Sequence, residues 1–177
     1  IDCLIHSFIR CGIQLYNSFS NVHIDRNDIR GRVDSDTHLV YSNGIYLYNI
    51  DDVFMSENGV RNVDRNGYEY FNPNILGANA RIFCHHNVAE NIGDNSALTS
   101  AEEGSDDAGF GFSLFGAVFT HIDNCAAIKC DGIGFEIFNN ATSLSQLNLF
   151  NCYSLNCVDA GMTLNGIKNA KISNVVI

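Results

Sequence analysis

The hexapeptide GYEYFN, residues 67–72, occurs in varied form five more times along the chain. Each copy begins with glycine and continues with alternating apolar residues: GIQLYN from Gly12, GIYLYN from Gly44, GFSLFG from Gly111, GFEIFN from Gly134 and GMTLNG from Gly161. The spacing between starts varies from 23 residues (Gly44 to Gly67) to 44 residues (Gly67 to Gly111). This pattern predicts a constant strand with connections of variable length.

Within each copy, alternation places positions two and four on one face of a strand and positions three and five on the other. Positions two and four form the predicted core face, which holds Ile13, Leu15, Ile45, Leu47, Tyr68, Tyr70, Phe112, Leu114, Phe135, Ile137, Met162 and Leu164.

A second pattern follows about ten residues after most copies: an apolar pair one residue apart, then Asn or Cys three positions on. It reads Val22/Ile24 with Asn27, Val53/Met55 with Asn58, Ile82/Cys84 with Asn87, Thr120/Ile122 with Cys125, and Leu147/Leu149 with Cys152. A small or apolar residue stands two positions later, at Ile29, Val60, Ala89, Ala127 and Ser154.

A strand, a turn, a second strand, a tight Asn turn and a short third strand make one coil of a parallel β-helix, and stacked coils bury a continuous core. We therefore expect an all-β solenoid of about six coils that forms a single domain over residues 1–177. The chain begins with Ile1 and stops within a strand-like segment. We interpret it as a fragment of a longer chain whose ends lack caps.

These repeats resemble the right-handed parallel β-helix of pectin-lyase-like proteins, a group that includes polysaccharide lyases, glycoside hydrolases, epimerases and phage tailspikes. The resemblance covers nearly the whole chain and is specific for the fold. Because this fold hosts several chemistries, the function must be argued from the site.

The outward positions of the hexapeptides supply the candidate site. Position five holds a column of aromatic residues, which we interpret either as a surface covered by a loop or a neighbouring chain, or as a platform for sugar rings. The predicted substrate-binding set is Tyr16, Tyr46, Tyr48, Phe71, Phe115 and Phe138, with Tyr46 contributed by position three.

Position three also holds Glu69 and Glu136, two coils apart. Their backbones should lie about 9 to 10 Å from each other. Glycoside hydrolysis uses two carboxylates, with about 6.5 to 9.5 Å between the carboxyl groups in inverting enzymes. The pair is thus a candidate for catalysis, with a solvated acidic face as the alternative.

Two long connections, residues 30–43 and 90–110, each lead into a hexapeptide and should fold over its outer face. The second is acidic, and Asp106 or Asp107 within it could partner Glu136; we include Asp107 in the predicted catalytic set. The same loop could hold calcium, although its spacing matches no known calcium loop. We otherwise predict no cofactor and no metal.

Composition limits the partners. The net charge of −10 argues against nucleic acid as a partner, because such binding requires basic residues that release phosphate counterions. No apolar run is long enough to span a bilayer, so we expect no membrane insertion. A polyanionic substrate would need a local Arg cluster or a bound cation. We interpret Arg26, Arg30, Arg32, Arg61 and Arg65 as a solvated flank or a subunit contact.

Cysteine and histidine give weaker signals. Cys125/Cys130 and Cys152/Cys157 occupy matching positions in consecutive coils, where zinc is possible but buried small hydrophobes are the simpler interpretation. Cysteine in place of Asn suggests folding in a reducing cytoplasm, with the virion or the extracellular space as the final location. His85 and His86 should point to opposite faces, because they are adjacent on a strand.

The leading hypothesis from the sequence is a carbohydrate-active protein of tailspike or depolymerase type that binds a polysaccharide and cleaves it as a glycoside hydrolase. A noncatalytic module of a trimeric fibre or adhesin shaft is the alternative. A polysaccharide lyase or epimerase is a further possibility. A homotrimer is the expected assembly.

Overall fold

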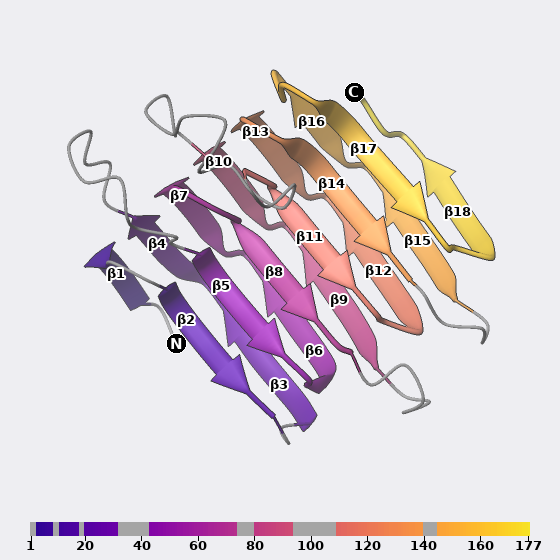
Figure 1. Cartoon of the computed structure of the whole chain (residues 1–177), viewed down its shortest axis with the longest axis horizontal. Coiled ribbons are helices and arrows are strands. Elements are labelled where there is room, and N and C mark those ends of the chain that lie inside the picture. Colours follow the sequence, from indigo (N-terminus) through magenta and orange to yellow (C-terminus); the bar gives the residue numbers. More distant parts are fainter. Residues whose placement is uncertain are drawn as a thin grey trace.

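A computed structural model describes residues 3–8, 11–17, 20–31, 43–73, 80–93, 109–139 and 145–177. Every helix or strand element in these residues is a β-strand, and the strands form three parallel six-stranded sheets (Figure 1). No helix long and apolar enough to cross a membrane occurs among the described residues. The predicted all-β, right-handed parallel β-helix of about six coils is confirmed.

The first sheet contains the hexapeptides. Its strands are β2 (Cys11–Tyr16), β5 (Asn43–Tyr48), β8 (Tyr68–Phe71), β11 (Phe112–Phe115), β14 (Ile133–Phe138) and β17 (Ala160–Asn165). The second sheet contains β3 (Ser20–Asp25), β6 (Asp51–Ser56), β9 (Arg81–His85), β12 (Phe119–Asp123), β15 (Gln146–Phe150) and β18 (Asn169–Ser173).

The third sheet contains β1 (Cys3–Phe8), β4 (Asn27–Gly31), β7 (Gly59–Val63), β10 (Val88–Ile92), β13 (Ala126–Cys130) and β16 (Tyr153–Leu155). A coil runs from a first-sheet strand to a second-sheet strand and then to a third-sheet strand, so β11, β12 and β13 make the fourth coil. Strands pair only with the corresponding strands of adjacent coils.

Asn-rich turns explain why the chain can close each coil so tightly. Most of the non-glycine residues with positive φ are asparagines, which adopt the left-handed conformation at low cost. The turn between the second and third sheets uses this conformation in successive coils, at Arg26, Glu57, His86, Asn124 and Asn151.

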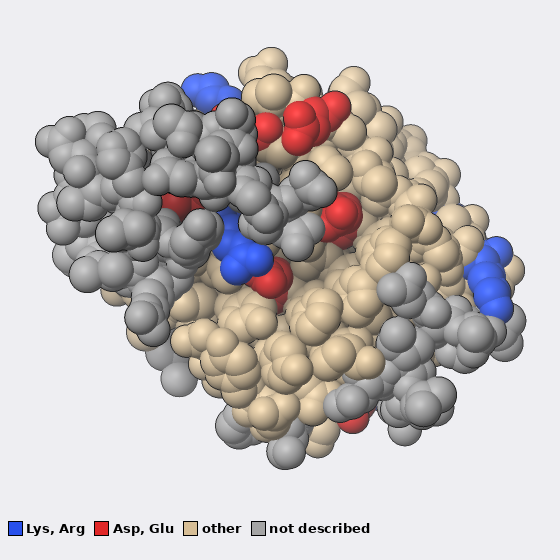
Figure 2. All heavy atoms as spheres, in the orientation of Figure 1, with Lys and Arg blue, Asp and Glu red and all other residues tan. Residues whose placement is uncertain are grey.

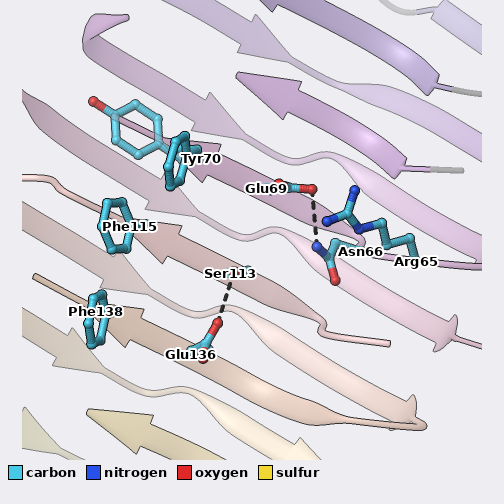
Figure 3. A pocket seen from close by; sticks show the side chains of 9 residues that line it. Arg65, Asn66, Glu69, Tyr70, Ser113, Phe115, Glu136 and Phe138 are labelled. Atoms are coloured by element: carbon cyan, nitrogen blue, oxygen red, sulfur yellow. Dashed lines mark hydrogen bonds between the residues drawn. The ribbon is translucent and has the colours of Figure 1, made fainter. Parts of the chain in front are cut away.

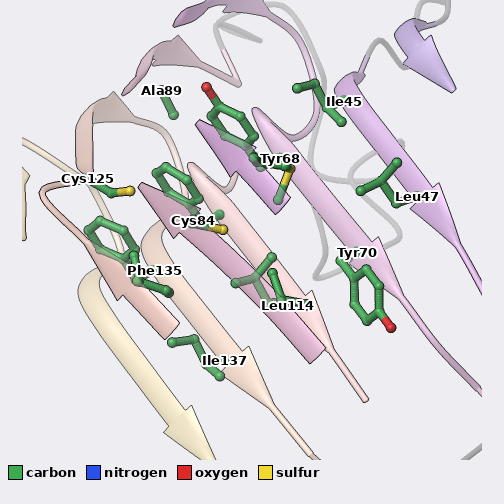
Figure 4. Packing of buried hydrophobic residues seen from close by; sticks show 14 of the residues in the cluster. Ile45, Leu47, Tyr68, Tyr70, Cys84, Ala89, Leu114, Cys125, Phe135 and Ile137 are labelled. Carbon is green, nitrogen blue, oxygen red and sulfur yellow. The ribbon is translucent and has the colours of Figure 1, made fainter. Parts of the chain in front are cut away.

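The core lies inside the three sheets, where equivalent residues of successive coils stack (Figure 4). Tyr68, Phe112 and Phe135 form a ring stack with centroid separations of 4.5 Å and 4.8 Å. Both buried tyrosines keep their hydroxyls bonded: Tyr68 donates to Asn58 O and Tyr70 to Ile50 O, each at 2.7 Å. The predicted core face is confirmed, although Ile13, Leu15, Met162 and Leu164, in the outermost coils, are only partly buried.

Candidate functional site

The outer face of the first sheet carries two parallel rows of side chains. The pairing register places position three of each hexapeptide in one row, here called the polar row: Gln14, Tyr46, Glu69, Ser113, Glu136 and Thr163. Position five forms the aromatic row: Tyr16, Tyr48, Phe71, Phe115 and Phe138, followed by Asn165. The structure therefore aligns the hexapeptides in the register that the sequence predicts.

The aromatic row is a continuous ladder of rings. Phe71 and Phe115 lie 4.8 Å apart between centroids with planes inclined by 22°, and Phe115 and Phe138 lie 5.0 Å apart at 18°. Tyr48 stacks on Phe71 at 5.8 Å, and Tyr16 is tilted over Tyr48 at 5.6 Å. Because neighbouring rings cover one another's faces, the middle of this ladder presents ring edges outward.

A pocket of about 330 Å³ lies between the two rows. Glu69 and Glu136 both line it, together with Ser113 of the intervening strand and the rings of Phe115 and Phe138 (Figure 3). The Ser113 hydroxyl bonds to Glu136 Oε2 at 3.0 Å, which fixes one carboxylate. The pocket thus brings together two carboxylates and part of the aromatic row.

Asn66 holds the other carboxylate, and the sequence interpretation missed it. Its Nδ2 donates to Glu69 Oε2 at 3.1 Å. Its Oδ1 accepts from Phe110 N, and its own backbone N–H donates to Asn43 Oδ1, both at 3.1 Å. The sequence marks Asn66 as a repeated position, because Asn43 and Asn66 each stand directly before the glycine of a hexapeptide, but it does not show which side chain Asn66 contacts.

Arg65, interpreted from the sequence as part of a solvated flank or a subunit contact, also lines this pocket. Its Nε is buried and has no hydrogen-bond partner among the described residues. Figure 2, which shows this face of the molecule, has basic and acidic side chains meeting in a hollow beside a largely uncharged surface. The site therefore offers guanidinium donors as well as carboxylates.

Tyr46 lies on the polar row beside Glu69. Its ring meets that of Tyr16 edge-on, with centroids 5.4 Å apart and an interplanar angle of 75°. Burial, and then the negative charge of Glu69, raise the pKa of the Tyr46 hydroxyl to about 12. Tyr46 therefore remains a neutral hydrogen-bonding group at physiological pH.

Asp107, Asp106 and the other residues of the acidic connection from 94 to 108 fall outside the described residues, and so does Arg32. Within the described ranges, no group of three or more His, Cys, Asp or Glu side chains is placed to hold a metal ion.

Two other arginines of the predicted flank form ion pairs on the third sheet. Arg61 bridges Asp28 and Glu90, at 3.1 Å to each, and Arg30 pairs with Asp28 at 2.6 Å. This outer face of the third sheet therefore carries a mixed-charge network, and among the flank arginines that the structure describes it is Arg65 that lines the pocket between the two rows.

The prediction that His85 and His86 point to opposite faces of a strand is wrong. The rings of His85 and His86 lie 3.9 Å apart, because His86 has a φ of 51° and turns the chain at the end of β9. His85 Nδ1 is 3.2 Å from Asp123 Oδ2 of the next coil. The two side chains thus lie at a corner of the coil and not on opposite faces of a strand.

All seven cysteines lie in the described residues, and none forms a disulfide. Cys84, Cys125, Cys130 and Cys152 are buried in the core. Burial raises the pKa of the Cys125 thiol to about 12, so this group is a neutral, weakly polar core residue at physiological pH.

Comparisons with known proteins identify the fold. No protein-family model matches the sequence, and no curated protein matches it. The crystal structure of pectate lyase Pel9A matches with a TM-score of 0.67 and 17% sequence identity over 97% of this chain. The match spans 46% of the pectate lyase chain, so this chain corresponds to less than half of that protein's length. From its sheets, its register and this match, we conclude that the chain has the right-handed parallel β-helix fold found in pectate lyase Pel9A.

Proposed function

We propose that this protein binds a polysaccharide along the outer face of the first sheet and cleaves a glycosidic bond between Glu69 and Glu136. The observation that carries the proposal is that both carboxylates line one pocket, with the single strand β11 between their strands. Two rungs of a sheet separate their backbones by about 9 to 10 Å. That spacing leaves room for a water molecule, as inversion at the sugar carbon requires.

The two carboxyl groups would act as an acid and base pair. One protonates the oxygen of the leaving sugar while the other removes a proton from the attacking water. Asn66 and Ser113 hold the two side chains in place by hydrogen bonds to Glu69 and Glu136. Asp107, outside the described residues, stays a predicted partner of Glu136.

The aromatic row would contribute to binding in two ways. Sugars stack on the faces of aromatic rings, and most faces in this row are covered by neighbouring rings. Phe138 is the exception among these rings, because Asn165 follows it on the next strand. We therefore assign ring stacking to Phe138, and assign an apolar wall of ring edges to Tyr48, Phe71 and Phe115.

A panel of neutral and acidic polysaccharides tests the proposal. Glu69→Gln and Glu136→Gln should each lower the rate of cleavage about 100-fold or more while glycan affinity changes little, because removal of a general acid or base costs about 10²- to 10⁴-fold. Glu57→Gln, an exposed glutamate in the turn after β6, is the matched control and should keep full activity. Normal turnover by both pocket variants would exclude the assignment.

Arg65 favours a second candidate, cleavage of an acidic polysaccharide by elimination. A sugar carboxylate could bind the guanidinium of Arg65, whose side chain lines the pocket, and the pectate lyase match makes this chemistry a natural comparison. Elimination leaves a carbon–carbon double bond in the product, which ultraviolet absorbance detects, whereas hydrolysis leaves none. Arg65→Gln should weaken binding of acidic glycans and leave neutral ones unchanged if this candidate is correct.

The ring edges favour a third candidate, a noncatalytic shaft in which the first-sheet face contacts another copy in a homotrimer. Tyr16, at one end of the aromatic row, is 49% exposed. Sedimentation separates the candidates: a stable trimer that neither binds nor cleaves glycans supports the shaft. In each case the site of action would be extracellular or on a virion, after synthesis in a reducing cytoplasm.

A further inference from the structure

Cys130 and Cys157 occupy the same corner of consecutive coils. The register of β13 with β16 pairs Ala127 with Ser154 and Ile128 with Leu155, and the same offset places Cys130 opposite Cys157. The backbone confirms that the offset continues, because Val158 N donates to Cys130 O at 2.9 Å. The two cysteines therefore lie on adjacent rungs of the stack.

This placement meets the geometric requirement for a disulfide. In-register residues of neighbouring strands have Cα atoms about 4.8 Å apart. Disulfides join Cα atoms about 4.4 to 6.8 Å apart. Both sulfurs face the interior at this corner: Cys130 Sγ lies against Gly111, and Cys157 Sγ lies 3.9 Å from Ala127 O of the coil that contains Cys130. Ser154 Oγ lies 3.2 Å from Cys157 Sγ and helps to fix its position.

The neighbouring pair, Cys125 and Cys152, shares the spacing but not the environment. Both thiols are buried, and each donates to a carbonyl of its own coil, at 3.4 Å to Asp123 O and 3.1 Å to Phe150 O. Cys157 is only partly buried, so a small oxidant reaches it more readily. The two pairs should therefore differ in their reactivity toward an oxidant.

We propose that Cys130 and Cys157 form a disulfide that joins the fourth coil to the fifth when the protein meets a peroxide oxidant. The Cys157 thiolate attacks hydrogen peroxide to give a sulfenic acid and hydroxide. The Cys130 thiol then attacks the Cys157 sulfur, an S–S bond forms, and water leaves with the transferred proton. Overall, two thiols are oxidised and one peroxide is reduced to two waters. The crosslink constrains the unfolded chain between the two residues and so stabilises these coils.

Peptide mapping under non-reducing conditions tests the proposal, using the reduced full chain with Cys3→Ser to remove an exposed thiol. Hydrogen peroxide followed by alkylation should give one crosslinked pair, residues 130 and 157, with the other thiols alkylated. Cys152→Ser should retain this crosslink, and Cys157→Ser should abolish it.

Stability provides an independent readout. The urea midpoint should rise on oxidation in the Cys3→Ser chain and stay unchanged in the chain that also carries Cys157→Ser. Two results would overturn the proposal: both thiols still free to alkylate after full oxidation, or a crosslink between residues 125 and 152 instead. Because Cys157 is only partly buried, its serine variant should fold even if Cys130→Ser does not.

Discussion

At the scale of single residues, the corner between the second and third sheets is held by a buried side-chain ladder. Asn27 N and Nδ2 donate to Asn58 Oδ1 at 3.0 Å and 2.8 Å, and Asn58 N and Nδ2 donate to Asn87 Oδ1 at 3.0 Å and 2.9 Å. In the next coil Cys125 takes this place, where its sulfur accepts from Asn87 N at 3.4 Å. The ladder thus satisfies buried backbone groups along the stack.

Asn58→Ala should lower the free energy of unfolding by about 3 kcal/mol, because each buried polar group left without a partner costs about 1 to 3 kcal/mol. The groups affected include Asn27 N and Ile24 O, which both bond to the Asn58 side chain. Urea unfolding measures the loss. Asn58→Cys should recover part of it, as Cys125 does in its own coil. Equal stability of wild type and Asn58→Ala would contradict the assigned role.

The position of this corner could be predicted from the sequence, because Asn or Cys recurs there three positions after each apolar pair. The contact between Asn66 and Glu69 was not predicted, since alternation says which face a strand residue occupies but not where a turn residue reaches. The same limit applies to Arg65 and His86, which lie in turns.

At the scale of the strand, the structure explains why the hexapeptides in the middle of the stack begin with glycine. A Cβ atom added at Gly67 would lie 2.7 Å from Gly111 O, one at Gly111 would lie 2.7 Å from Gly134 O, and one at Gly134 would lie 2.7 Å from Gly161 O. These carbonyls also accept ladder hydrogen bonds, such as Tyr68 N to Gly111 O at 2.9 Å. A side chain here would therefore push adjacent coils apart.

Gly111→Ala should destabilise the protein by more than about 2 kcal/mol, because overpacking of this kind typically costs about 1 to 3 kcal/mol and the atom it meets is backbone. Gly59→Ala is the matched control, since its added Cβ would meet nothing closer than Arg61 Nη1 at 3.5 Å. Thermal unfolding of the two variants measures the difference. Comparable midpoints for both would contradict the steric role of this column.

The strand pattern in the sequence predicts the sheets well, because a period of two and a repeated start fix both face and register. It predicts that the rings of the aromatic row share a face, but not that they stack on each other. Stacking depends on side-chain rotation across strands, which a single strand's pattern does not encode. Strand β1 was also missed, since no complete hexapeptide coil precedes it.

At the scale of the whole molecule, burial of tyrosine and cysteine side chains couples stability to alkaline pH. Burial raises the pKa of Tyr68 well above its ordinary value of 10.0, and burial raises that of Cys125 from 9.0 to about 12. The unfolded chain releases these protons at a lower pH than the folded one does. Their contribution to stability is therefore complete below about pH 9 and is lost as the pH rises above it.

The free energy of unfolding should thus fall between pH 9 and pH 11, by up to about 1.4 kcal/mol per pH unit for each fully buried group above its unfolded pKa. Urea titrations at a series of pH values measure the slope. For Tyr68→Phe, the free energy of unfolding should fall less steeply above pH 10, because the phenylalanine ring cannot ionise and still stacks on Phe112. An identical slope for wild type and Tyr68→Phe would contradict this origin.

Because strands pair only with the equivalent strands of adjacent coils, the solenoid changes length by whole coils. Residues 111–133 make up one complete coil, and their excision would join Phe110 directly to Gly134. Strands β8 and β14 would then be neighbours in the same register that each now has with β11. Glu136 would then sit immediately above Glu69. Removing one coil would therefore shorten the distance between the backbones of these two glutamates by one strand spacing, with no change to either side chain.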